Sequence, residues 1–288
     1  MKKIGIIGKG FVGSAVAHGF SEATGYQAEI KIFDKNPLRS TNSLEELVTS
    51  SDVIFISVPT PSNKDGSINL EILSQCLSEI NHIATQTDSY NAVYLIRSTV
   101  VPGTTRSFQE QFPKLKLVFN PEFLTERSAN FDFISQSRFI LGGSEDNAKA
   151  VSDLYKDRFG NSVSVIITDY ESAELTKYVC NTFFATKVSF LNEMRILSDK
   201  VNANWDDVME GFLRDGRIGN SHSQVPGPDG KFGFGGSCFP KDIQALIHFA
   251  DGLEIDLSVL KGAWKTNIKV RPEKDWEELV GRAVVKDG

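Results

Sequence analysis

A cysteine lies between a glycine pair and a lysine–aspartate pair in the segment Gly235-Gly236-Ser237-Cys238-Phe239-Pro240-Lys241-Asp242. Cysteine attacks electrophiles as the thiolate, and a lysine beside the start of a helix favours that charged form. The segment therefore predicts a nucleophile at Cys238, although a buried structural cysteine in a glycine loop gives the same pattern. Cys76 and Cys180 lie in helical apolar patterns, which favours a structural role for both.

A second group of polar residues is spaced for one face of a helix. Glu174, Lys177 and Asn181 stand at i, i+3 and i+7 in a stretch, 170–201, that contains no glycine or proline. On a helix this spacing brings the three side chains to the same side. A lysine and an asparagine that converge on one point can stabilise an oxyanion, and a lysine can also act as a base. A solvated helix face remains the alternative.

A glycine-rich turn lies near the N-terminus. The motif Gly8-x-Gly10-x-x-Gly13 follows an apolar run at 3–7 and opens a helical pattern, and Asp34 ends the next β-rich run 34 − 13 = 21 residues later. Such glycines let a pyrophosphate approach the start of a helix, and an acid at that distance binds the ribose hydroxyls. The pattern predicts NAD rather than NADP as the ligand, and the adjacent Lys35 weakens that preference. A βα turn without a ligand is the alternative.

Two further polar segments follow predicted strands. Ser98-Thr99 comes after the run at 92–97, and 121–126 (PEFLTE) comes after 115–119. Ligands of open α/β sheets bind at the carboxyl ends of the strands, where both segments lie. Each segment alone is equally consistent with loop capping.

The elements that position these residues form an α/β fold. Apolar runs at 3–7, 28–33, 52–58, 92–97, 115–119, 138–141 and 163–167 alternate with helical patterns at 14–20, 44–49 and 69–86. This alternation predicts a doubly wound, Rossmann-type parallel sheet covered on both faces. Beyond residue 168 the pattern becomes helical, at 170–201, 205–213, 241–252 and 256–268, and a glycine-rich loop spans 214–240. We expect an NAD-binding domain at 1–168, a helical central domain at 169–270 and a charged, peripheral tail at 271–288.

Composition excludes several classes of protein. At 288 residues the chain is long enough for about two domains of ~150 residues. A net charge of 31 − 37 = −6 disfavours nucleic acid or an anionic membrane as partner. Three cysteines are too few for a disulfide framework, which indicates reduced thiols and a cytoplasmic setting. We predict no membrane span and no metal site.

Together the segments resemble motifs of the nucleotide-sugar dehydrogenases, the UDP-glucose/GDP-mannose dehydrogenase family. The resemblance covers residues 1 to about 268 and is strongest at 233–242 (GFGGSCFPKD). Four other segments match family motifs in the same order: Pro59-Thr60-Pro61, Ser98-Thr99, 121–126 (PEFLTE) and 174–181 (ELTKYVCN). The resemblance implies an enzyme that oxidises the C6 alcohol of a nucleotide sugar to a carboxylate and reduces two NAD per turnover.

The resemblance also implies a role for each matching residue. Cys238 would form a thiohemiacetal and then a thioester with the substrate, Lys177 and Asn181 would hold the C6 oxygen, and Asp242 would assist Lys177. Thr99 and Glu122 would position water, with Glu122 as the base. The implied cofactor contacts are Gly8, Gly10, Phe11, Val12, Gly13, Asp34, Lys35, Pro59, Thr60, Ser98, Thr99, Glu126 and Lys241. The implied substrate contacts are Glu122, Phe123, Leu124, Lys177, Asn181, Arg217, Phe232, Gly233, Phe234, Gly235 and Gly236.

The long helix would form a homodimer interface, and Arg217 would reach the substrate of the neighbouring subunit. Members of the family usually continue into a third domain that holds the nucleotide, so we expect either a naturally short form without that domain or a truncated chain. We hypothesise that the loop 223–231 covers the nucleotide instead. The segment 236–242 resembles the UDP-glucose and GDP-mannose branches of the family. Of the two substrates we favour UDP-glucose, giving UDP-glucuronate.

Two other functions compete with this interpretation. A two-electron β-hydroxy-acid dehydrogenase also combines a glycine turn with a helix that carries a catalytic lysine, but it has no need for Cys238. A non-catalytic nucleotide-sugar binding subunit would have no chemical reason to keep all of the implied catalytic residues together.

Overall fold

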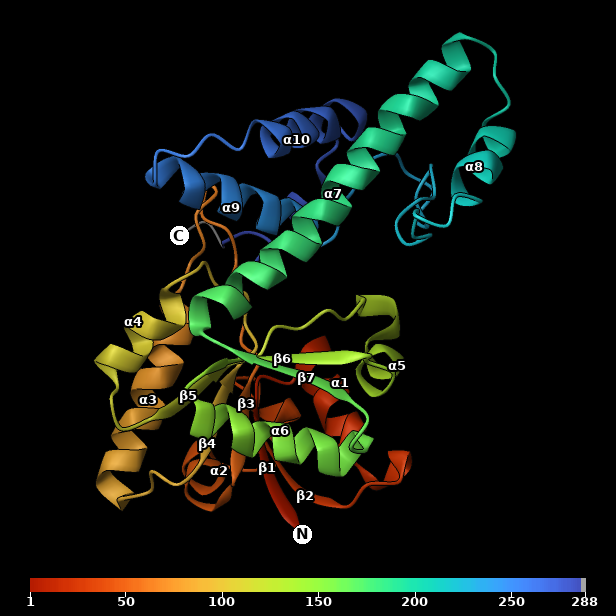
Figure 1. Ribbon diagram of the computed structural model, residues 1–288. Helices are drawn as coiled ribbons and strands as arrows, with labels where there is room; N and C mark the ends of the chain where they lie inside the picture. The colour runs from red at the N-terminus through yellow and green to blue at the C-terminus, as the bar shows by residue number, and fades with distance from the viewer. Residues whose placement is uncertain (286–288) are drawn as a thin grey trace. The chain divides into compact units, whose positions relative to one another are not determined.

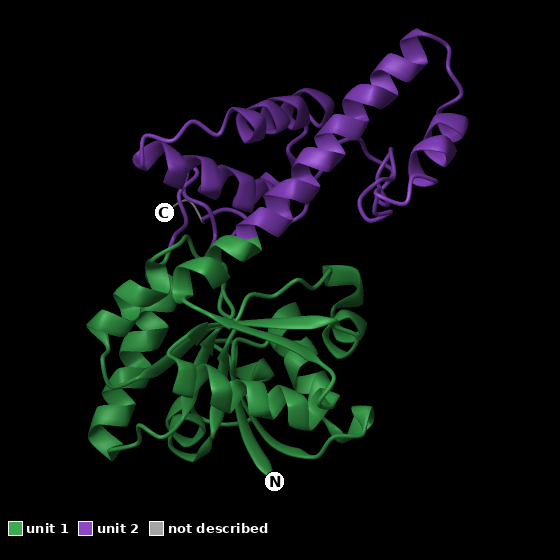
Figure 2. Cartoon of the chain, in the orientation of Figure 1, with its two compact units in different colours: residues 1–60, 70–177 green, residues 61–69, 178–288 purple. Residues whose placement is uncertain are grey.

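The computed structural model describes residues 1–285, and its chain forms two compact units, green and purple in Figure 2. Unit 1 comprises Met1–Thr60 and Leu70–Lys177, and unit 2 comprises Pro61–Asn69 and Tyr178–Gly288. Each unit has its own clusters of buried apolar side chains. The division at 177/178 lies inside a helix, whereas the predicted domain boundary near 168 coincides with the start of that helix; the domain boundary therefore stays a prediction.

Unit 1 is built on a seven-stranded sheet with the order β2-β1-β3-β4-β5-β6-β7 (Figure 1). The strands are β1 (Lys2–Ile7), β2 (Ala28–Phe33), β3 (Val53–Ile56), β4 (Val93–Ile96), β5 (Lys116–Phe119), β6 (Arg138–Gly143) and β7 (Ser164–Thr168). All neighbouring strands are parallel except β5 and β6, because the chain leaves β5 at the same edge of the sheet at which it enters β6. The predicted α/β class and the seven predicted strands are confirmed.

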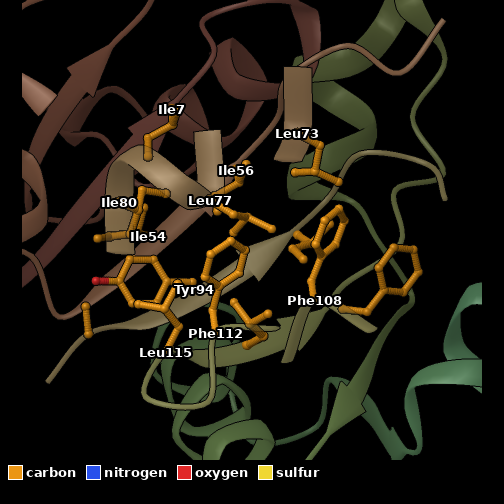
Figure 3. Packing of buried hydrophobic residues seen from close by; sticks show 14 of the residues in the cluster. Ile7, Ile54, Ile56, Leu73, Leu77, Ile80, Tyr94, Phe108, Phe112 and Leu115 are labelled. Carbon is orange, nitrogen blue, oxygen red and sulfur yellow. The ribbon is translucent and has the colours of Figure 1, made fainter. Parts of the chain in front are cut away.

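Helices cover both faces of this sheet, as its continuously apolar strands require. They are α1 (Phe11–Gly19), α2 (Leu44–Ser50), α3 (Glu71–Thr87), α4 (Thr104–Gln111), α5 (Ala129–Ile134) and α6 (Glu145–Phe159), of which the sequence patterns predicted the first three. Figure 3 shows one buried layer, in which Ile54 and Ile56 of β3 lie near Leu77 and Ile80 of α3. The opposite layer is rich in aromatic rings, among them Phe139 and Tyr155, which stack at 3.9 Å between centroids.

Unit 2 is helical. Helix α7 (Tyr170–Lys200) begins in unit 1 and continues through unit 2, followed by α8 (Trp205–Leu213), α9 (Phe239–Gly252) and α10 (Ser258–Val270). These bounds agree closely with the predicted helices. Within unit 2, Ala185 of α7, Ile243 of α9 and Ala263 of α10 belong to one apolar cluster. None of the helices within residues 1–285 is both long and apolar enough to cross a membrane.

The tail was predicted to be peripheral, and this was wrong for its described part. Arg271, Trp276 and Ala283 are buried, and the ring of Trp276 contacts Trp264 of α10 at 5.4 Å between centroids. Residue 62 exchanges backbone hydrogen bonds with 283 and 285, so the tail pairs with the segment 61–69 of the same unit. The charged residues of the tail had suggested exposure to solvent, but Asp275 forms ion pairs with Arg271 and with Lys231 of the glycine-rich loop. Residues 286–288 of the predicted tail lie outside the described residues.

Candidate active site

The glycine turn of unit 1 has the geometry of a dinucleotide-binding loop. Gly8 has a positive φ of 88°, and a Cβ there would lie 2.6 Å from the carbonyl oxygen of Ser57. A Cβ at Gly13 would lie 2.0 Å from the carbonyl oxygen of Gly8, so both positions require glycine. A Cβ at Gly10 would meet nothing within 4 Å, and no side chain caps the N-terminus of α1 at this residue. The helix start is therefore open to an anion such as a pyrophosphate, with Phe11 and Val12 in its first turn.

Asp34 lies beside this turn at the end of β2. Its Oδ2 accepts a hydrogen bond of 2.7 Å from the backbone N–H of Lys9, and its Oδ1 accepts one of 2.8 Å from Asn36. The carboxylate is thus held next to the glycines, as the predicted contact with ribose requires. Lys35 points to Gln75, with 3.4 Å between Nζ and Oε1.

The loops after β3 and β4 are tied together at the carboxyl edge of the sheet. Thr60 donates a hydrogen bond of 2.8 Å from Oγ1 to the carbonyl oxygen of Thr99, and Ser98 donates one of 2.6 Å to that of Val58. Pro59 lies between the linked residues. The structure therefore brings together the predicted cofactor residues that follow these two strands.

Glu122 and Lys177 form a buried ion pair in unit 1. Their side chains are 6% and 4% exposed, and 2.8 Å separates Oε1 from Nζ. The ammonium also donates to the carbonyl oxygen of Glu122, and Oε2 accepts a hydrogen bond of 2.8 Å from the N–H of Leu124. The Phe123 ring lies 5.5 Å from the ammonium. A buried carboxylate and ammonium in contact form an arrangement that can exchange a proton with a substrate.

Glu174, on the same predicted helix face, has a different place. Its carboxylate accepts hydrogen bonds of 2.6 and 2.7 Å from the N–H groups of Gly103 and Thr105, at the start of α4. Burial raises the pKa of Glu174 to about 7. The buried carboxylate thus caps the N-terminus of α4. This capping role accounts for a charged residue at this position without any catalytic role.

A buried polar network under the loops after β4 and β5 was missed by the sequence patterns. Asn120, which precedes the Pro121-Glu122 segment, accepts hydrogen bonds from Arg97 and from the Tyr155 hydroxyl, and donates to the carbonyl oxygen of Ile140. Arg97, which precedes Ser98-Thr99, is 2% exposed, and its Nε and Nη2 have no hydrogen-bond partner within the described residues. The network links the two loops that carry predicted catalytic residues.

Unit 2 gathers a second group of predicted residues around Asp242. This carboxylate is 1% exposed and accepts hydrogen bonds of 2.6 Å from Lys241 Nζ and of 2.6 Å from Asn181 Nδ2. The backbone N–H of Asp242 donates to the carbonyl oxygen of Cys238, which stands immediately before the first residue of α9. The structure therefore joins Asn181, Asp242 and Lys241, and places Cys238 one helical turn before Asp242. Asn181 itself lies one turn beyond Lys177 on α7.

The glycine run before Cys238 is held by asparagine side chains. Asn267 accepts a hydrogen bond of 2.7 Å from the N–H of Phe234 and donates one to its carbonyl oxygen, while Asn192 accepts from the N–H of Gly233. Gly233 and Gly236 have positive φ values of 70° and 72°, which favour glycine. Neither asparagine was singled out from the sequence, because their partners are backbone groups far along the chain.

Some predicted residues lie apart from these groups. The Arg217 side chain is 88% exposed and pairs with Asp215, and Glu126 begins a short 3₁₀ helix, Glu126–Ser128. The loop 223–231 directs Asp229 and Lys231 to ion pairs with Arg271 and Asp275. The hypothesis that this loop covers a nucleotide stays a prediction.

An aromatic stack next to Cys238 was also missed. The His222 ring lies 4.3 Å from that of Phe184 on α7 and 5.2 Å from that of Phe239, which follows the cysteine. Burial lowers the pKa of His222. A single histidine in a long loop carries no periodic signal, so its partners were not predictable.

Comparison with known proteins identifies the family. The family model described as the UDP-glucose/GDP-mannose dehydrogenase family, NAD binding domain, matches residues 27–158, and that of the same family's central domain matches 171–269. The chain belongs to the UDP-glucose/GDP-mannose dehydrogenase family, and its N-terminal part is that family's NAD-binding domain. The glycine turn at 8–13 precedes the matched residues, so its assignment depends on the geometry given above.

Similar proteins carry corresponding names. The chain is 34% identical to the UDP-glucose 6-dehydrogenase of Rickettsia prowazekii over 258 residues, which are 86% of this chain and 57% of the relative. It is 35% identical to UDP-glucose 6-dehydrogenase YwqF of Bacillus subtilis over 240 residues, or 80% of this chain and 51% of the relative. The chain thus spans little more than half the length of these curated relatives.

Solved structures agree with the fold. A UDP-glucose dehydrogenase from the archaeon Pyrobaculum islandicum superposes with a TM-score of 0.80 at 29% identity, covering 93% of this chain and 68% of that one. The Mycobacterium tuberculosis 3-hydroxyisobutyrate dehydrogenase superposes with a TM-score of 0.72 over 95% of both chains. At 15% identity the second likeness shows the fold alone.

Proposed function

We propose that this protein oxidises the C6 alcohol of UDP-glucose to the carboxylate of UDP-glucuronate, with two NAD reduced per turnover. The observation that carries the proposal is the placement of Cys238 one helical turn before the buried Asp242–Asn181–Lys241 group. A two-electron alcohol oxidation has no use for a thiol, whereas a four-electron oxidation needs a covalent bond that retains the aldehyde. Family membership and the names of the relatives support the same activity.

The proposed reaction divides its steps between the two groups of residues. NAD, held at the glycine turn and Asp34, would supply the hydride acceptor for each of the two oxidation steps. Lys177 passes its own proton through Glu122 to solvent and, as the neutral amine, takes up the hydroxyl proton when the alcohol becomes the aldehyde. The Cys238 thiolate then adds to the aldehyde carbon, and the new oxyanion is stabilised by Lys177 and Asn181.

Loss of the second hydride converts this thiohemiacetal to a thioester. Glu122 removes a proton from water, which Thr99 positions, and the water adds to the thioester carbon. The C–S bond breaks, the acid leaves, and the thiolate is restored. Asp242 orients the Asn181 amide through their hydrogen bond of 2.6 Å. The proposed contacts with NAD are those of the glycine turn, Asp34, Lys35, Pro59, Thr60, Ser98, Thr99, Glu126 and Lys241.

We further propose a set of residues that contact the sugar nucleotide. These are Phe123 and Leu124 after β5 together with the segment Phe232, Gly233, Phe234, Gly235 and Gly236. GDP-mannose is the second candidate substrate. The domains are proposed to be 1–168 and 169–270, so that α7 carries Lys177 and Asn181 within the central domain.

Homodimerisation through α7 is also proposed. Large apolar side chains lie exposed along its unit 2 portion, among them Val179 at 55%, Phe183 at 63% and Leu197 at 54%. Burial against a second copy would remove this apolar surface from water. Arg217 would then reach the partner's substrate. Light scattering that shows twice the monomer mass for wild type, and the monomer mass for Phe183→Glu, would support the dimer; a monomeric wild type would contradict it.

The deciding experiment counts NADH per sugar consumed, with UDP-glucose, GDP-mannose and UDP-N-acetylmannosamine in separate samples. Two NADH per UDP-glucose, together with loss of acid production in Cys238→Ser but not in the control Cys76→Ala, would support the proposal. One NADH per sugar would indicate a two-electron dehydrogenase. Binding without NADH from any sugar would favour a binding subunit.

A further inference from the structure

The guanidinium of Arg271 is a buried charge at the end of α10, with acidic partners from two segments. The side chain is 3% exposed. Its Nη2 donates hydrogen bonds of 2.8 Å to Asp229 in the glycine-rich loop and of 2.7 Å to Asp275, and its Nε donates one of 2.9 Å to Asp275. These hydrogen bonds lower the pKa of Asp275 to about 2, so the network stays charged at every pH at which the protein would be assayed.

The same guanidinium lies against the backbone of the glycine run before Cys238. A Cβ at Gly235 would lie 2.6 Å from Nη2 and 2.7 Å from Cζ, so the flat face of the guanidinium occupies the space beside this glycine. Nη1 also points to the carbonyl oxygen of Phe232, at 3.5 Å. Asp229 and Asp275 fix the guanidinium from its other edges, and Arg271 in turn supports the run.

Arg271 is the last such support before the cysteine. Residues 233 and 234 are fixed independently, by Asn192 and Asn267. Gly236 is exposed, has a positive φ of 72°, and a Cβ there would meet nothing within 4 Å. Gly235 is therefore the residue of this run that contacts the guanidinium, two positions before Ser237, which is buried beside the cysteine. Its contact with Arg271 limits where the chain can enter the first turn of α9.

We propose that Arg271, braced by Asp229 and Asp275, is a positioning residue that sets the placement of the Cys238 thiol. The proposal rests on the proposed function only for its kinetic readout, because the reactivity of the thiol can be measured without sugar or NAD. The proposal also gives the loop 227–231 a supporting role, because Asp229 holds the guanidinium that contacts the segment before the cysteine.

The test uses the full chain with two substitutions. Asp229→Asn keeps the side-chain oxygen that accepts from the Lys231 N–H at 3.1 Å but removes the charge that holds Arg271. Arg271→Lys keeps the positive charge but removes the planar fork. Asp251→Asn is the matched control, because it removes one carboxylate from an exposed ion pair, with Lys261, in the same unit.

Two measurements separate positioning from general destabilisation. The rate of alkylation by iodoacetamide is followed at Cys238 and at Cys180 by peptide mass spectrometry, at a temperature well below the Tm of each variant. The kcat and the KM for NAD are measured with UDP-glucose. We expect both variants to raise the Cys238 rate severalfold, because the half-buried thiol loses its support, and to leave the Cys180 rate and the KM for NAD unchanged. We expect kcat to fall by about tenfold, because the misplaced thiol attacks less well.

Wild-type alkylation rates at Cys238 and a wild-type kcat in both variants, with only Tm lowered, would overturn the proposal. A parallel rise at Cys180 would do so too, because it would show loosening of the whole unit. If the wild-type chain forms no NADH with any sugar, the proposed function fails, and the contrast between Cys238 and Cys180 alone decides whether Arg271 positions the thiol.

Discussion

Removing the charge of Asp242 should destabilise unit 2 strongly. Removing the charge of its partner Lys241 as well should recover most of the lost stability. Asp242→Asn leaves the Lys241 ammonium, whose side chain is 8% exposed, without the carboxylate now 2.6 Å away. The new asparagine also has only one oxygen. Its NH2 group must therefore face either the Lys241 ammonium or Asn181 Nδ2, and both of these are donors. Breaking one side of a buried ion pair costs about 3–5 kcal/mol, whereas replacing both charges by neutral groups of similar volume is often neutral.

The assay follows from where the tryptophans lie. All three, Trp205, Trp264 and Trp276, belong to unit 2, so tryptophan fluorescence reports the unfolding of that unit within the whole chain. With a denaturant slope of about 2 kcal/mol per molar urea, a loss of about 4 kcal/mol lowers the unfolding midpoint by about 2 M. The double variant Lys241→Met/Asp242→Asn should unfold within about 0.5 M of wild type.

Two results would refute this reasoning. A midpoint for Asp242→Asn within about 0.5 M of wild type would mean that the Lys241 ammonium finds water or another acceptor. A double variant no more stable than Asp242→Asn would mean that the loss comes from Asn181 or from packing. The exposed pair of Lys261 and Asp251 supplies the control, because removing one partner there should cost less than about 1 kcal/mol.

Three other perturbations test unit 1. Asp34→Asn should raise the KM for NAD by about tenfold or more, which corresponds to the loss of one charged hydrogen bond, and should leave kcat and the KM for UDP-glucose unchanged. A raised kcat/KM for NADP would confirm that Asp34 discriminates NAD from NADP. Asn120→Ala should lower the free energy of unfolding of unit 1 by about 3 kcal/mol, seen in thermal unfolding by circular dichroism, because it leaves Arg97 and Tyr155 without their shared acceptor. Glu174 has a pKa raised by burial from 4.5 to about 7, so the folded state binds the extra proton and unit 1 should lose stability, by up to about 3 kcal/mol, as pH rises from 5 to 8. In Glu174→Gln this dependence should be weaker, and an unchanged slope would contradict the assignment.

Local signals in the sequence explain why so much of the fold was predictable. The strands near the centre of the sheet, such as β3 and β4, are buried on both faces and are apolar without interruption. Helix α7 is free of glycine and proline for 31 residues. Helices α4, α5 and α6 escaped prediction, and of these α4 and α5 are short. The start of α4 is capped by Glu174, which lies 71 residues further along the chain than Gly103. No local pattern contains that information.

The candidate site divides in the same way. Gly8, Gly13, Asp34 and Cys238 could be proposed from the sequence, because the proposed chemistry of each depends on neighbours within a turn or a βα unit. The spacing of Glu174, Lys177 and Asn181 predicted one shared face, but the structure gives them three separate partners: the start of α4, Glu122 and Asp242. Asn120, Asn267 and Arg271 were missed because each binds groups contributed by segments distant in sequence.

The distribution of buried charge separates stability from chemistry. Glu122, Lys177, Lys241 and Asp242 are all less than one-tenth exposed, and apolar residues of similar size would hold these positions at no loss of stability. Each pair therefore stabilises the fold little more than a pair of apolar residues would. Removing one partner of a pair, however, strongly destabilises the fold, because the other charge stays buried and unpaired. Each pair fixes a carboxylate and an ammonium in one orientation with little exposure to water, which is what the proposed proton transfer and oxyanion would need. By contrast, the surface pairs of Arg214 with Glu210 and Lys261 with Asp256 are exposed and tie no catalytic candidate in place. Buried charge thus lies beside the loop after β5 and in the first turn of α9, as well as at Arg97, Glu174 and Arg271. At the first two places a change of one atom should alter both turnover and folding.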